Sequence, residues 1–220
     1  MSRQPRLSGL LLLAVLSCPA ASLAQTEPPA SPHTFVAPTA RMLEPGHGYV
    51  SGYGLFVPSV QVGVTRRFSM GGGAMLPFGT GVVPVWVTPK VQLFDGQRVD
   101  VAAGVIHAVF GSAANVGLAY VVATRGDESG SATFGASMAY ARASGDGGQM
   151  PVFLVSGERR VSPRVRVMTE NYYSPVGGGM ATFGFRIQGR AGSFDLGVAA
   201  PFARGGVFAL LPILNWGYRF

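Results

Sequence analysis

The chain has 220 residues, of which 32 are glycine and only 12% are charged, and its formal net charge is +7 at pH 7. So much glycine argues against a helical protein, and so few charges argue against a disordered one. The arginines are spread over predicted turns instead of forming one basic stripe, so nucleic acid is not an expected partner.

The hydrophobicity of the chain has no helical explanation. The mean hydropathy is +0.32, yet no run of about 20 apolar residues follows the first two dozen positions, so no membrane-spanning helix is expected. A β-barrel accounts for the value, because its lipid-facing side chains alternate with inward-facing ones and do not form a run.

Residues 1–24 have the features of a secretory signal peptide. Two arginines precede an apolar run at residues 10–16, and the small residues Ser22 and Ala24 allow cleavage after Ala24. Cleavage would remove Cys18, the only cysteine, and leave no disulfide. The alternative is a lipoprotein signal in which Cys18 carries the lipid, and the sequence leaves both open.

Residues 25–46 are rich in proline and alanine and follow neither the helical nor the strand period. We expect a flexible, polyproline-like periplasmic segment. Its prolines are Pro28, Pro29, Pro32, Pro38 and Pro45.

Residues 47–220 alternate between strand patterns of about ten residues and turn-forming residues, which is typical of transmembrane β-segments. The strands are expected at residues 48–57, 60–65, 68–76, 82–94, 99–110, 115–124, 132–142, 150–157, 164–173, 179–188, 193–200 and 207–220. The predicted fold is all-β, a transmembrane antiparallel up-and-down barrel of about 12 strands, with 10 to 14 possible.

The last strand carries the clearest alternation. Trp216, Tyr218 and Phe220 share one face of an extended chain, while polar residues and glycine fall between them. An aromatic carboxy-terminal strand of this kind resembles the insertion signal of bacterial outer-membrane β-barrels. The resemblance implies recognition by the outer-membrane insertion machinery, and contact with membrane lipid and lipopolysaccharide.

A wider resemblance covers residues 41–220. The strand pattern, the segment 169–172 and the aromatic end together resemble the uncharacterised small outer-membrane β-barrel proteins of Gram-negative bacteria, with a porin-like architecture. This implies an outer-membrane location but transfers no functional residue.

The inward face of the predicted strands offers one polar set, which can be interpreted in two ways. In a wet lumen mixed charges screen permeating ions; in a narrow barrel they form a structural salt-bridge network. The predicted lumen-facing residues are Lys90, Arg164, Arg166, Glu170, Arg186, Asp195, Asn215 and Arg219. Small residues at other inward positions leave a cavity or let the wall bend: Gly104, Gly117, Gly135, Ser137, Gly184 and Gly197.

Catalytic and cofactor chemistry find little support. The histidines are His33, His47 and His107; no two share a ligand spacing, and His107 has no serine beside it in a lipase pattern. The glycine strings at 71–73 and 177–179 lack the Gly-Lys-Ser/Thr of a phosphate loop. We therefore predict no enzyme activity, no catalytic residue, no metal and no cofactor.

The expected function is an integral outer-membrane barrel that is structural or a narrow passive pore, with a basic excess that mildly favours anions. One alternative is a secreted or periplasmic soluble β-protein that binds an apolar ligand. Another is a lipid-modifying barrel enzyme, which would need a reactive serine near His107. The ligand, the ability to conduct and the oligomeric state do not follow from the sequence.

Overall fold

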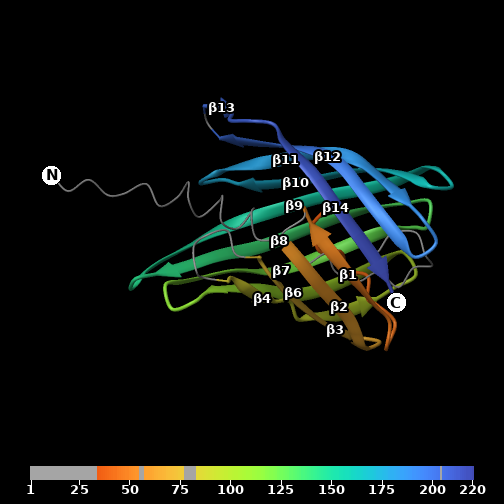
Figure 1. Cartoon of the computed structure of the whole chain (residues 1–220), viewed down its shortest axis with the longest axis horizontal. Helices are drawn as coiled ribbons and strands as arrows, with labels where there is room; N and C mark the ends of the chain where they lie inside the picture. Colours follow the sequence, from red (N-terminus) through yellow and green to blue (C-terminus); the bar gives the residue numbers. More distant parts are fainter. Residues whose placement is uncertain (1–33, 55–56, 77–82, 204) are drawn as a thin grey trace.

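The structure is a computed structural model that describes residues 34–54, 57–76, 83–203 and 205–220. All its named strands belong to one sheet (Figure 1). No helix in these ranges is long and apolar enough to cross a membrane. The predicted signal peptide, residues 1–24, and residues 25–33 lie outside the described part of the chain.

The strands follow one another along the chain with short connections. They are β1 (Gly48–Tyr53), β2 (Val57–Thr65), β3 (Phe68–Ala74), β4 (Val85–Val87), β5 (Lys90–Asp95), β6 (Val99–Phe110), β7 (Ala114–Asp127), β8 (Gly130–Ala143), β9 (Asp146–Ser162), β10 (Val165–Ser174), β11 (Gly178–Gln188), β12 (Gly192–Ala203), β13 (Gly206–Val207) and β14 (Leu211–Arg219).

The sheet closes on itself. β1 pairs antiparallel with β2 on one side and with β14 on the other, and β14 pairs in turn with β12. β4 and β5 share one place between β3 and β6, and β13 and β14 share one place beside β12. The fourteen segments therefore occupy 12 strand positions in a closed antiparallel barrel, which confirms the predicted fold and strand number.

A proline explains why one strand of the barrel is divided into β4 and β5. Pro89 has no N–H to donate to the ladder. Pairing continues past it, because Thr88 N donates to Gly71 O (2.8 Å) and Val105 N donates to Pro89 O (3.1 Å). The wall is thus continuous at this point.

The outer face of the barrel is apolar. Along β11, Phe183, Phe185 and Ile187 are 51%, 44% and 48% exposed, whereas the residues between them are buried. The same alternation of apolar outside and buried polar or small inside recurs in β12, where Phe194 and Leu196 are exposed and Asp195 is buried. A soluble protein has apolar side chains inside and polar ones outside. The arrangement seen here, with apolar side chains outside, matches a barrel that faces lipid.

The hairpin between β8 and β9 is tighter than the sequence pattern suggests. Ser144 and Gly145 form a two-residue turn with φ of 49° and 91°, as a type I′ turn requires. β9 begins directly after it at Asp146 and runs to Ser162, well beyond the predicted 150–157. Gly147, Gly148 and Gly157, which lie near the ends of the predicted strand 150–157, suggest turns in the sequence. In the structure they pair with residues of the neighbouring strands and belong to β9.

Residues 34–43 lie inside the barrel, and we call them the plug. All of them are buried except the half-buried Val36. Ala37, Ala40 and Leu43 pack in the main apolar cluster with inward-facing wall residues such as Ile106 and Leu154. The segment predicted to be flexible over 25–46 is therefore ordered and enclosed in this part.

Candidate functional site

The candidate site is the lumen, and the structure places seven of the predicted polar residues on its wall. Six are buried: Lys90, Arg166, Glu170, Arg186, Asp195 and Asn215. Arg219 is half-buried and lies opposite the inward-facing Tyr49 of β1.

Arg164 is the exception. It lies in the exposed turn between β9 and β10, because β10 begins one residue later, and a register irregularity follows between Val165 and Arg166. The prediction that Arg164 and Arg166 share the lumen face is wrong for Arg164.

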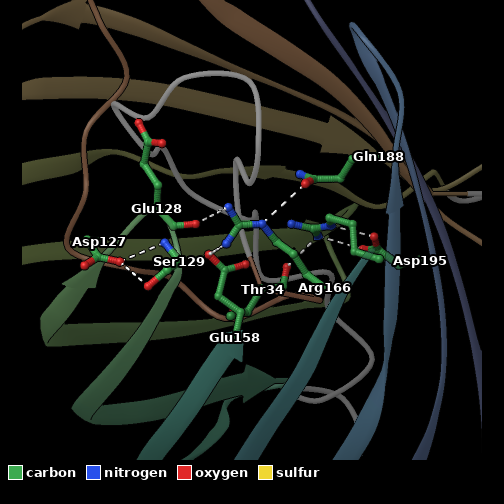
Figure 2. Close-up of polar contacts among 9 residues, drawn as sticks. Thr34, Asp127, Glu128, Ser129, Glu158, Arg166, Gln188 and Asp195 are labelled. Carbon is green, nitrogen blue, oxygen red and sulfur yellow. Dashed lines mark hydrogen bonds and ion pairs between the residues drawn. The ribbon is translucent and has the colours of Figure 1, made fainter. Parts of the chain in front are cut away.

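A first polar cluster joins β9, β10 and β11 (Figure 2). Arg166 NH1 donates to Glu158 Oε1 (3.2 Å), its Nε donates to Gln188 Oε1 (3.3 Å), and its NH2 donates to the main-chain oxygen of Glu128 (2.7 Å). Both partners of the Arg166–Glu158 ion pair are fully buried. The hydrogen bond to the main-chain oxygen of Glu128 ties β10 to the turn between β7 and β8.

A second ion pair lies beside it. Arg186 and Asp195 are directly opposite each other on β11 and β12, and the guanidinium donates to both carboxylate oxygens at 2.6 and 2.7 Å. Arg166 and Arg186 are also direct cross-strand neighbours. Two arginines that face each other are thus balanced by carboxylates on either side, Glu158 and Asp195.

Glu158 and Gln188 belong to the lumen network but were not among the predicted site residues. Glu158 falls just after the predicted strand 150–157 and before the next one, 164–173. The alternation of buried residues along β9 (Leu154, Ser156, Glu158) is the signal that would have placed it inside.

A second group of wall residues binds the main chain of the plug. Glu170 Oε2 accepts the N–H groups of Val36 (2.8 Å) and Ala37 (2.7 Å), and Glu170 Oε1 accepts the hydroxyl of Tyr172 (2.6 Å). On the opposite side Lys90 Nζ donates to Thr39 O (3.0 Å) and to the main-chain oxygen of Arg41.

Three further wall residues bind the main chain of the plug. Thr124 Oγ1 accepts the N–H of Ala40 at 2.8 Å. Arg186 NH2 donates to Thr34 O, and Asn215 Nδ2 donates to Phe35 O, each at 3.3 Å. The plug is therefore held from β5, β7, β10, β11 and β14, which surround it.

Phe35 of the plug occupies a recess in the wall. Its side chain is 0% exposed. Gly184 and Gly197 are cross-strand neighbours, and a Cβ on either would come within 2.8 Å or 3.0 Å of Phe35 Cζ. The two glycines thus leave room for the aromatic ring, and here the small inward residues are filled by the plug instead of leaving a cavity.

Gly117 does not belong to the inward set. Its neighbours Val116 and Leu118 pack inside the barrel, so Gly117 faces outward, and the ring of Tyr140 lies over it. The Tyr140 hydroxyl reaches His107 Nδ1 across the glycine at 2.9 Å. His107 therefore contacts an aromatic residue of the outer face.

The buried charges are nearly balanced. Lys90, Arg166 and Arg186 on the wall stand against Glu158, Glu170 and Asp195, and Arg41 of the plug adds a further cation (all buried). Within the described residues no group of three or more His, Cys, Asp or Glu could hold a metal ion.

A shallow depression of about 650 Å³ lies over β5 to β8. Its lining includes the outward-facing Val91, Val121 and Met138, which are 41–48% exposed. It is part of the apolar outer surface and not an enclosed pocket.

Comparison with known proteins shows a similarity of fold. No protein-family model matches the chain, and no curated protein matches it. Among solved structures it is similar to the KdgM porin in complex with disordered oligogalacturonate, with 7% identity, a TM-score of 0.57, and coverage of 79% of this chain and 96% of that chain.

Two further solved structures have a similar fold. A second KdgM porin structure has 8% identity and a TM-score of 0.56, with 79% and 96% of the two chains covered. The NanC porin has 11% identity and a TM-score of 0.51, with 79% and 98% covered. The chain is a porin-like 12-stranded β-barrel. At these identities the likeness concerns the fold alone.

Proposed function

We propose that the chain is an integral outer-membrane barrel whose lumen is a narrow passive pore. The observation that carries this is a closed barrel with an apolar outer face whose inner wall, beside its apolar cluster, carries buried charged and polar groups. Charged and polar groups on an inner wall can interact with hydrated solutes, as they do in water-filled barrels. The porins that share its fold support the same class of function.

The pore favours anions mildly in this proposal. Lys90 and Arg219 line the wall outside the two buried ion pairs, and the chain has a formal net charge of +7 at pH 7. The near balance of the buried charges argues that the preference is small.

A structural role is the second candidate, and a specific observation favours it. The plug fills part of the lumen, and the Arg166–Glu158 and Arg186–Asp195 pairs tie neighbouring strands together. A barrel of this kind strengthens the membrane without conducting.

Planar-bilayer recording across a KCl gradient separates the two. A pore gives discrete conductance steps, rare in the parent chain because of the plug, and a reversal potential of anion sign. A Lys90→Gln/Arg219→Gln variant moves that potential toward zero, whereas Arg164→Gln in the exposed turn leaves it unchanged. Cation preference in the parent, unaltered in the double variant, contradicts the proposed selectivity.

A further inference from the structure

We propose that the plug, residues 34–43, is a releasable gate that closes the lumen and is latched by Glu170. This rests on the proposed pore function, and it assigns to residues of the same chain the task of opening and closing that pore. Four features of the described residues carry it.

First, the plug adds no strand to the barrel. The ladder closes through β1 and β14, whose register runs from Tyr49–Arg219 to Tyr53–Asn215 without any plug residue. The plug can therefore leave without breaking a hydrogen bond of the barrel wall. A segment that closed the sheet could not do so.

Second, the wall recognises the plug as it would a bound peptide. The contacts described above reach main-chain atoms of residues 34, 35, 36, 37, 39, 40 and 41 through side chains of the wall. Two consecutive N–H groups converge on one oxygen of Glu170. One carboxyl oxygen that accepts two adjacent N–H groups fixes the position of the main chain at that point, so we take Glu170 as the latch.

Third, Phe35 anchors the plug in a recess. Gly184 and Gly197 lie side by side on β11 and β12 and leave the space that the ring fills. The recess is ring-sized, and Asn215 binds the carbonyl of the same residue. Side chain and main chain of Phe35 are thus held together.

Fourth, a hinge follows the plug. Gly46 has φ of +82°, a conformation that glycine adopts without strain. Gly46 itself and His47 are fixed to the rim, because Gly46 N donates to Gly63 O (2.9 Å) and Gly63 N donates to His47 O (3.0 Å). The plug can therefore move on the side before Gly46 while the barrel end stays in place.

Thiol labelling reports on release of the plug. The full chain carries Cys18→Ser and Ala37→Cys, and a water-soluble maleimide is added to the folded protein. Ala37 is 0% exposed and beside the latch, so slow labelling is expected. Glu170→Gln should raise the labelling rate at least ten-fold. The matched control is Glu128→Gln, an exposed carboxylate whose main-chain oxygen still binds Arg166.

A cross-link then joins labelling to conductance. Ala40 N lies 2.8 Å from Thr124 Oγ1, so the two residues are neighbours, and a chain with cysteines at both positions, again with Cys18→Ser, is tested for a disulfide by oxidation. The oxidised chain should show no conductance steps and reduction should restore them, while Glu170→Gln should make steps frequent. Heat-dependent electrophoretic mobility shows that each variant retains a folded barrel.

The outcomes separate the two proposals. Equal and non-zero conductance of the oxidised and reduced chains overturns the gate and leaves the pore standing. In a chain that conducts, equal labelling of Ala37→Cys with Glu170→Gln and with Glu128→Gln does the same. Faster labelling in Glu170→Gln without any conductance overturns the pore and leaves the releasable plug standing.

Discussion

Truncation of Phe35 to alanine should open the plug without weakening the barrel. The ring is fully buried between the plug and the Gly184–Gly197 recess. Replacing a buried phenylalanine by alanine costs about 3–5 kcal/mol. Because Phe35 is outside the ladder, that cost falls on the docked plug, and the ratio of released to docked plug should rise by roughly two to three and a half powers of ten.

The assay compares two variants of similar chemistry. In Phe35→Ala the labelling of Ala37→Cys and the frequency of conductance steps should rise together, while the temperature of the heat-dependent mobility shift changes little. Phe183→Ala removes an equally large ring that is 51% exposed on the outer face, and it should change neither readout. A fall in the barrel's unfolding temperature in Phe35→Ala, with no gain in labelling, would refute this reasoning, since the plug would then be a permanent part of the core.

Three further outcomes are expected. Arg166→Ala leaves the buried carboxylate of Glu158 without its ion-pair partner, a change that costs about 3–5 kcal/mol; the mobility shift should occur at a lower temperature, and Arg164→Ala in the exposed turn should leave it within experimental error. Removal of Phe220 should reduce the amount of folded barrel in the outer-membrane fraction at equal synthesis, and an unchanged amount would remove the insertion-signal hypothesis. Lys90→Gln weakens the hold on two plug carbonyls, so labelling of the plug should rise several-fold, less than in Phe35→Ala.

The barrel could be predicted because its physics repeats along the chain. Most strands show apolar residues in alternation with polar or small ones, and single-chain bacterial barrels have an even number of such strands. Phe134 and Met138 face outward and Thr133 and Ala139 inward, as the alternation indicates. Counting the segments with this alternating pattern gives the 12 strands of the barrel.

The contents of the barrel could not be predicted in the same way. An irregular segment in a lumen touches different walls in succession, so its sequence carries no period, and residues 34–43 resemble a flexible linker. Their partners are scattered along the chain: Glu170 is 133 residues from Ala37, and Asn215 is 180 residues from Phe35. One sequence does not reveal such pairings.

Two residues, Arg164 and Gly117, were wrongly placed on the lumen face because of the local strand pattern around each of them. Arg164 was placed on the wall because strand β10 was begun one residue early, and Gly117 was placed inside although its neighbours Val116 and Leu118 take the inward positions. Single-residue errors of register exchange the two faces of a strand. The terminal residues of a strand pattern are therefore the least secure part of a site prediction.

The most direct test of an integral outer-membrane barrel is the electrophoretic mobility of the carbonate-washed membrane fraction, with and without boiling. The protein should remain with the outer membrane after the wash, migrate as a compact species when unheated, and shift on heating as the closed sheet unfolds. Release by the wash, or identical mobility before and after boiling, would contradict a closed barrel embedded in lipid.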